Sequence, residues 1–259
     1  MHQLEAVIAE YDPDFIGLQE TKVPDTDFPA DEINAMGYQA AYHGQKTHYG
    51  VALLYKLPPT KIIKGYATDD SESQKRFISG TFETKDKELL TVVNGYFPQG
   101  ENRDHPTKFP AKQKFYAELM NYLNDNHNPD DLLFVIGDMN IAPLDQDIGI
   151  GEANMKRWLK DGKTSFLPEE RSWLKTLCQW GLTDVYRHHY PDKPDLFSWF
   201  DYRSRGFERE PKRGLRIDLI MATRKAIELS IDSGIDYRIR SMEKPSDHCP
   251  VWANFNVDL

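Results

Sequence analysis

Four acidic residues lie at the beginning or end of short apolar runs of the sequence or, in the case of Asp218, interrupt such a run. They are Glu20, Asp138, Asp218 and Asp247, the last of which is followed by His248. A rigid scaffold can bring side chains from distant sequence positions together at strand ends. Hard cations such as Mg²⁺ prefer oxygen ligands, usually one or two carboxylates with water and a substrate phosphate. Together these residues predict a divalent-metal site for chemistry on phosphate.

Each of these residues also has a purely structural interpretation. Asp138 could form a turn after a strand, Glu20 could be an exposed charge at a strand end, and His248 alone is more typical of a structural histidine. Asp218 is harder to explain in this way, because an acid between an isoleucine and a leucine is seldom solvated. A buried carboxylate without a partner is strongly unfavourable. Their joint occurrence is what favours a catalytic site.

The apolar runs predict the strands that position these residues. Strands are expected over 15–18, 51–55, 89–93, 132–136, 215–221 and 251–255. Helices are expected over the first dozen residues, after Pro110, and from Pro168 to Gly181. Several strands follow one another without a helix between them, which favours stacked sheets with outer helices over a doubly wound parallel sheet. We expect a single α/β domain over residues 1–259.

Composition limits the class of protein. The chain has 259 residues and a hydrophobic content of 39%, enough for a sizeable core. It has only two cysteines, Cys178 and Cys249, so no disulfide framework is implied. Its start lacks the features of a secretory signal, and no apolar run reaches the roughly 18 residues of a membrane helix. A soluble cytoplasmic protein without membrane association is expected.

The formal net charge of −9 does not exclude a nucleic-acid partner. A polyanion is bound by a local basic face, and a metal site adds carboxylates to the sum. Two stretches could supply such a face. They are Lys108 to Lys114, and the basic residues Arg203, Arg205, Arg209, Lys212, Arg213 and Arg216.

Several short motifs carry a resemblance to a known family. They are Gln19-Glu20-Thr21-Lys22, Asn94-Gly95-Tyr96-Phe97-Pro98-Gln99-Gly100, Gly137-Asp138-Met139-Asn140, Phe197-Ser198-Trp199-Phe200-Asp201-Tyr202-Arg203, Arg216-Ile217-Asp218 and Ser246-Asp247-His248. In this order they resemble the bacterial exodeoxyribonuclease III and AP endonuclease family, almost continuously from residue 2 to residue 256. The resemblance implies a four-layer α/β/β/α sandwich of the deoxyribonuclease type. It also implies 3′-to-5′ exonuclease action on duplex DNA, incision at abasic sites, and removal of 3′-phosphates and other blocking groups.

The resemblance further implies roles in metal-assisted attack of water on a phosphodiester. Asp138 positions or deprotonates the water, and Asn140 holds a phosphate oxygen through its amide. Asp218 fixes the tautomer of His248, which stabilises phosphate charge. Tyr96, otherwise an ordinary strand-end tyrosine, reaches the scissile phosphate or the leaving oxygen. The implied environment of the metal, Mg²⁺ or Mn²⁺ in its place, comprises Glu20 as principal ligand, Asp138, Asn140, Asp247 and His248.

The family positions also imply DNA contacts. Trp199 with Phe197 corresponds to the wall of a pocket for a bare sugar flipped from the helix, although such aromatic clusters are otherwise mostly core. Arg76, Gln99 and Lys108 are expected to contact the backbone or a groove, and each could equally be a solvated surface residue. The expected partner is double-stranded DNA with abasic sites or 3′ ends, and the expected state is a monomer.

The start of the chain departs from the family pattern. Family members normally begin with a strand reading roughly Ser-Phe-Asn-Ile-Asn-Gly, whereas here Met1 leads directly into the first helix. That strand would lie inside one sheet, with its first asparagine beside Glu20. We favour a start assigned too far downstream over a naturally shortened chain. The shortened chain is expected to be less stable and to bind the metal more weakly, because unpaired buried backbone groups cost on the order of 1–3 kcal/mol each.

Two rival functions share part of this interpretation. One is a phosphatase or sphingomyelinase-like member of the same superfamily, acting on inositol phosphates or lipids. The other is a truncated, inactive DNA-binding remnant. The segment around Trp199 and the basic stretches favour DNA, and the presence of every other catalytic position favours an active enzyme.

Overall fold

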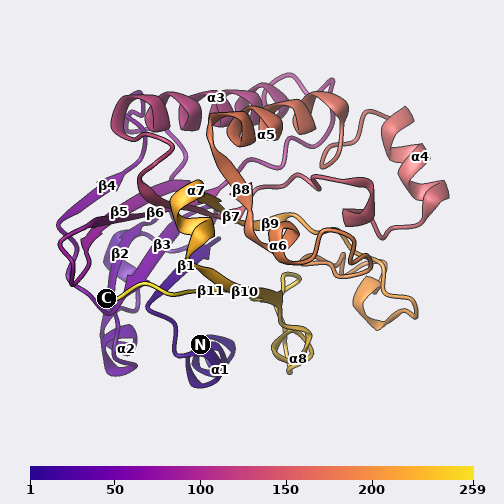
Figure 1. Cartoon of the computed structure of the whole chain (residues 1–259). Coiled ribbons are helices and arrows are strands. Elements are labelled where there is room, and N and C mark those ends of the chain that lie inside the picture. The colour runs from indigo at the N-terminus through magenta and orange to yellow at the C-terminus, as the bar shows by residue number, and fades with distance from the viewer.

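The protein forms four layers in the computed structural model, which describes residues 1–259 (Figure 1). Helices α3 (Lys108–Asn126) and α5 (Pro168–Trp180) cover one face of a six-stranded sheet. A second β layer packs on the other face of that sheet. Helices α1 (His2–Tyr11) and α2 (Ala30–Ala35) lie outside this second layer. The predicted α/β/β/α arrangement is confirmed.

The six-stranded sheet has the strand order β4-β5-β6-β7-β9-β8. Its strands are β4 (Lys61–Lys64), β5 (Phe77–Glu83), β6 (Leu89–Tyr96), β7 (Leu132–Asp138), β9 (Asp218–Thr223) and β8 (Leu182–Asp184). All neighbours are antiparallel except β6 and β7, which α3 connects as the crossover that a parallel pair requires. The carboxyl ends of β6 and β7 therefore meet at one edge, where the antiparallel β9 begins.

The second β layer consists of two separate sheets. One has the order β1-β3-β2, and the other pairs β10 with β11. Their strands are β1 (Phe15–Gln19), β3 (Val51–Tyr55), β2 (Gln39–His43), β10 (Ser230–Ile235) and β11 (Val251–Phe255). A groove of about 550 Å³ lies between β1 and β11, and every residue of both strands lines it. Both strands are thus sheet edges without a neighbour on the groove side.

Alternation of side chains along β3 explains how the second layer holds two cores. All five residues of β3 are buried. Val51, Leu53 and Tyr55 belong to the core between the two β layers, whereas Ala52 and Leu54 pack in the cluster below α1 and α2. Successive side chains of a strand point to opposite faces. A continuous apolar run is therefore what a strand covered on both faces requires.

The remaining helices are short. They are α4 (Glu152–Lys160), α6 (Val185–His189), α7 (Arg224–Glu228) and α8 (Tyr237–Arg240). None of the helices in the chain combines the length and apolar character that crossing a membrane needs.

Two expected elements begin at a different residue from the one predicted. The helix expected after Pro110 begins earlier, at Lys108, because proline is tolerated in a first helical turn, where its missing N–H would have no partner. The strand expected over 215–221 begins only at Asp218, because Leu215 instead bridges Ile148 and Trp199. Asp218 therefore stands at the start of a strand and not within it.

Candidate active site

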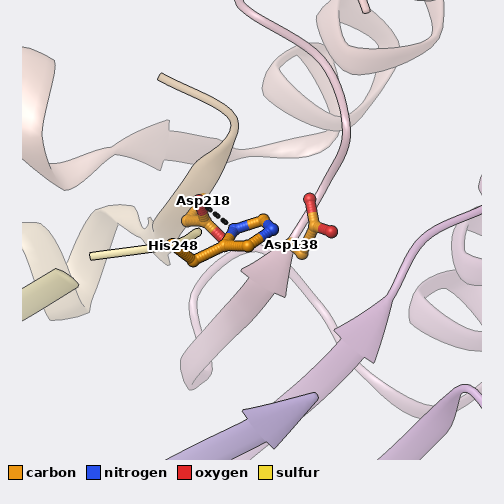
Figure 2. A group of neighbouring side chains, drawn as sticks. All are labelled: Asp138, Asp218 and His248. Atoms are coloured by element: carbon orange, nitrogen blue, oxygen red, sulfur yellow. Dashed lines mark hydrogen bonds and ion pairs between the residues drawn. The ribbon is translucent and has the colours of Figure 1, made fainter. Parts of the chain in front are cut away.

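Two of the predicted carboxylates meet at one edge of the six-stranded sheet. Asp138 is the last residue of β7 and Asp218 the first of β9, and they are directly opposite in the ladder. His248 precedes β11 in the other layer, and its Nδ1 lies 2.9 Å from each oxygen of Asp218. Figure 2 shows the imidazole between the two carboxylates. One ligand atom from each of these three residues lies within 4.8 Å of the others.

The charges of these three residues depend on one another. Burial opposes a charge on His248, but the Asp218 carboxylate outweighs it and raises the pKa of the imidazole to about 10. His248 is therefore a cation near neutral pH. Burial is the main cause that raises the pKa of Asp138 to about 7, although the neighbouring His248 acts to lower it. A carboxyl group whose pKa lies near the working pH is suited to proton transfer.

Glu20 and Tyr96 form the adjoining part of the site. Glu20 follows β1 directly, and Tyr96 ends β6 opposite Asp138. The Tyr96 hydroxyl donates to Oε1 of Glu20, and Nζ of Lys22 lies 2.9 Å from Oε2. Burial acts to raise the pKa of Glu20, but these two donors offset it and hold the pKa below its ordinary value. Glu20 is therefore an anion that can face a cation.

Asp247 joins the site through Trp199. Nε1 of Trp199 donates to Oδ2 of Asp247 at 3.1 Å, and the backbone of Trp199 bridges that of His248. Asp247 directly precedes His248, and Glu20 is linked to Asp138 through Tyr96, which pairs with Asp138 in the ladder and donates to Glu20. The acids taken from distant points of the sequence thus lie in one place.

The sequence matches the model of the Endonuclease/Exonuclease/phosphatase family over residues 1–248. The chain belongs to this family. Within it, the chain is 56% identical over 254 residues to exodeoxyribonuclease III of Haemophilus influenzae. The alignment covers 98% of this chain and 94% of that protein. The predicted resemblance is confirmed, and the chain is an enzyme of a hydrolase family.

Solved structures of family members are similar over nearly the whole chain. One is the 3′ phosphatase NExo from Neisseria bound to a product DNA hairpin, with a TM-score of 0.87, 33% identity, and coverage of 98% of this chain and 93% of that one. Another is an AP endonuclease from Archaeoglobus fulgidus, with a TM-score of 0.88, 30% identity, and coverage of 99% and 94%.

Nucleases of this family depend on metal ions, and the residues at this sheet edge fit one. The Asp138 carboxylate is only 5% exposed, and its hydrogen-bond donors are the backbone and side-chain amides of Asn140, without a basic side chain. A cation would compensate this buried charge. One ligand atom each of Asp138, Asp218 and His248 forms a compact group, in which the two carboxylates offer the ligand oxygens because the charged imidazole has no free lone pair. Glu20 and Asp247, predicted as ligands, lie beside that group and outside its 4.8 Å limit.

Asn140 is buried, and its side chain contacts Asp138 instead of facing solvent. It is 5% exposed and has a positive φ of 53°, a conformation that costs energy for a residue other than glycine. Its backbone N–H donates to one oxygen of Asp138, and its side-chain amide donates to the other and to the carbonyl of Phe97. The amide expected to hold a phosphate oxygen thus orients Asp138 in this structure.

The five predicted DNA contacts fall into exposed and buried sets. Gln99 and Lys108 are exposed, with Lys108 paired to a surface glutamate, and Trp199 is partly exposed. Phe197 is 1% exposed and belongs to a small core cluster. Arg76 is 8% exposed, and its guanidinium lies between the rings of two tyrosines, 4.1 Å from one ring centre and 4.5 Å from the other.

Two residues of the predicted basic faces are not on the surface. Lys112 is 0% exposed and Arg216 is 1% exposed. Lys112 pairs with Glu170, and Arg216 donates to both Asp147 and Asp184. The interpretation of these two side chains as surface charge was wrong, because each has a buried acid as its partner.

Sequence reasoning missed two residues that position the site. The buried hydroxyl of Ser198 accepts from the backbone N–H of Ile217 and of Asp218, which fixes the start of β9. Ser198 lies inside one of the family motifs, so the motif offered a signal. Tyr49 stacks on the guanidinium of Arg76 and stands outside every motif considered, so the sequence offered none.

Proposed function

We propose that this chain is a metal-dependent phosphodiesterase of DNA repair that acts on duplex DNA. In this proposal it removes nucleotides from 3′ ends, incises the strand at abasic sites, and removes 3′-phosphates and other blocking groups. The observation that carries the proposal is the Asp138 carboxylate, buried at a sheet edge beside the charged Asp218–His248 pair. The proposed metal is Mg²⁺, with Mn²⁺ as a substitute, and the proposed place of action is the cytoplasm.

The proposed roles follow from which groups can move a proton and which carry fixed charge. Asp138 accepts a proton from the attacking water, because its raised pKa makes it the base of the group. The His248 cation, held by Asp218, stabilises the negative charge that develops on the phosphate. The Tyr96 hydroxyl has a single proton, which it donates to Glu20 in the free chain. In our proposal it donates this proton instead to the scissile phosphate or the leaving oxygen when the substrate is bound.

A divalent cation, when bound, neutralises phosphate charge and lowers the pKa of water. In our proposal Glu20 is its principal ligand, with Asp138 beside it. Asn140 keeps the Asp138 carboxylate in one orientation, and Asp247 completes the environment, held by Trp199. The same residues then serve to orient the phosphate and to bind the metal.

The proposed substrate is double-stranded DNA with an abasic site or a 3′ end, bound by a monomer. The relatives support this choice, since one is a 3′ phosphatase bound to a DNA hairpin and another is an AP endonuclease. Trp199, Gln99 and Lys108 are the proposed contacts, because their side chains are exposed or partly exposed. Arg76 and Phe197 are proposed to support this surface from below, since both are buried.

The proposal is tested with a duplex that carries one abasic analogue, incubated with and without Mg²⁺. The unaltered chain is expected to incise this duplex, and EDTA is expected to stop the reaction. Asp138→Asn is expected to lower kcat by about 10²- to 10⁴-fold, because the proton acceptor is lost. The matched control is Asp130→Asn. Asp130 is an exposed acid that pairs with Arg224, and this substitution is expected to leave kcat unchanged.

The same assay separates the rival functions. A DNA-binding remnant would bind the abasic duplex and never cut it. A phosphatase of another branch would hydrolyse inositol phosphates and leave the duplex intact. Either result would contradict the proposed nuclease.

A further inference from the structure

One ion pair in the protein is completely buried beside the candidate site. Lys112 lies on α3 and Glu170 on α5, and both side chains are 0% exposed. Nζ of Lys112 and Oε1 of Glu170 are 2.5 Å apart. Neither residue belongs to one of the family motifs named above, and neither has a role in the mechanism proposed for the site.

The ion pair connects three loops. Nζ of Lys112 also lies 2.8 Å from the carbonyl of Asn140, in the loop after β7, and 3.3 Å from the carbonyl of Gln99, in the loop after β6. An ammonium group has three donors, so all of them are used. The other oxygen of Glu170 accepts the N–H groups of Ser165 and Leu167, each at 2.8 Å, just before α5.

Stability alone does not account for such a pair. Removing two charges from water costs several kcal/mol per ion, and replacing a buried pair by uncharged groups of similar volume is often neutral or stabilising. The Lys112–Glu170 pair therefore indicates a role in holding the neighbouring loops in a fixed position. The residue that it holds most directly is Asn140, whose backbone is in the left-handed region and whose amides grip Asp138.

We propose that Lys112 and Glu170 form a positioning pair that fixes Asn140, and through it the Asp138 carboxylate, for the reaction. The pair acts through other residues and touches neither the DNA nor the reacting atoms. This inference rests on the proposed role of Asp138. The Lys112 ammonium also donates to the carbonyl of Gln99, a proposed DNA contact, and so links the loop after β6 to the loop that contains Asn140.

The test compares a single and a double variant for both melting temperature and kcat. Lys112→Met leaves the Glu170 carboxylate buried without its cation, so Tm is expected to fall. The double variant Lys112→Met with Glu170→Gln removes both charges and keeps an oxygen for the N–H groups of Ser165 and Leu167. Tm is therefore expected to recover. In the double variant kcat is expected to remain about 10- to 100-fold below that of the unaltered chain, with KM within about threefold, because misplacement of a reacting group lowers kcat.

Recovery of kcat together with Tm in the double variant would overturn the inference, because the pair would then be merely structural. If the double variant does not fold, Glu170→Gln alone decides, and an unchanged kcat in that variant also overturns it. The matched control is Glu169→Gln, which removes the neighbouring exposed pair with Arg103 on the same turn of α5 and is expected to keep full activity. Failure of the proposed function is distinguished by the unaltered chain, which would then not cut the abasic duplex, and failure of the proposed role of Asp138 by an unchanged kcat in Asp138→Asn.

Discussion

The two β layers differ in continuity, and the candidate active site draws on both. The six-stranded sheet is unbroken, and Tyr96, Asp138 and Asp218 stand at the ends of its inner strands β6, β7 and β9. The other layer is divided by the groove between β1 and β11, and Glu20 and His248 stand next to the two strands that flank it. The half of the site on the six-stranded sheet is thus fixed by strand pairing on both sides, whereas Glu20 and His248 depend on the edge strands β1 and β11.

This difference shows that Glu20, which follows an edge strand, is held by fewer contacts than the residues of the six-stranded sheet. All five residues of β3 are buried, whereas every residue of β1 is only partly buried. An edge strand presents unpaired N–H and C=O groups along its length. The position of Glu20 therefore depends on its bonds to Tyr96 and Lys22 and on the pairing of β1 with β3. We expect changes at the groove to alter both stability and metal affinity.

The largest expected effect comes from supplying a strand for the groove. A chain extended before Met1 by a strand of the sequence Ser-Phe-Asn-Ile-Asn-Gly is expected to melt about 10 °C higher, because several new backbone hydrogen bonds contribute about 1 kcal/mol each. It is also expected to bind Mg²⁺ more tightly and to cut faster, because Glu20 would gain a fixed neighbour. Melting temperature, metal titration and nuclease rate measure these three effects.

The control for this experiment is an extension of equal length made of glycine and serine, which has little tendency to form a strand. It is expected to leave Tm and rate unchanged. Equal values for the strand-forming extension and the unextended chain would reject the idea that the groove limits either property.

The next effect concerns the residue that joins the two layers. Asn94 on β6 is 0% exposed, and its amide donates to the carbonyls of Leu18 and Ala52 in the opposite layer while its oxygen accepts from Gln19. Asn94→Ala leaves these partners unsatisfied and is expected to cost about 3 kcal/mol. It is also expected to weaken Mg²⁺ binding, because Glu20 directly follows the residues that lose their bonds.

Urea denaturation and metal titration check this prediction. Asn254→Ala, at an exposed position of β11, is the matched control and is expected to change stability by less than about 0.5 kcal/mol. A loss of stability with unchanged metal affinity would show that Glu20 is positioned independently of the bonds between layers.

The same contrast explains how much the sequence could predict. The continuous apolar runs identified the strands, because a buried strand must be apolar on both faces. The acids at their ends were found because metal and phosphate chemistry requires carboxylates there. Both signals are local, and the structure places Asp138, Asp218 and His248 together as expected.

Features that depend on distant partners were not predictable. Lys112 and Arg216 look like surface charge in the sequence, yet their acidic partners stand 58 and 69 residues away. Whether a charged side chain is buried depends on whether the fold brings such a partner to it. The contact of Arg76 with Tyr49 is of the same kind, since stacking on a ring leaves no local pattern.

The smallest expected effect compares one hydroxyl in each region. The Tyr116 hydroxyl donates to the carbonyl of Met139 in the core under α3, and the Tyr38 hydroxyl donates to the carbonyl of Pro13, a residue that lines the groove. Tyr116→Phe is expected to cost about 2 kcal/mol, because its partner is left buried and unsatisfied. Tyr38→Phe is expected to cost about 0.5–1 kcal/mol, because water in the groove can replace the hydroxyl.

Urea midpoints at unchanged m-value measure both losses, since a constant m-value shows that the exposed area on unfolding is the same. Equal losses would mean that the groove is as dry as the core under α3. Repeating Tyr38→Phe in the strand-extended chain gives the sharper result. If a strand fills the groove and excludes water from the Pro13 carbonyl, the cost of Tyr38→Phe should rise toward that of Tyr116→Phe, while the cost of Tyr116→Phe should stay the same.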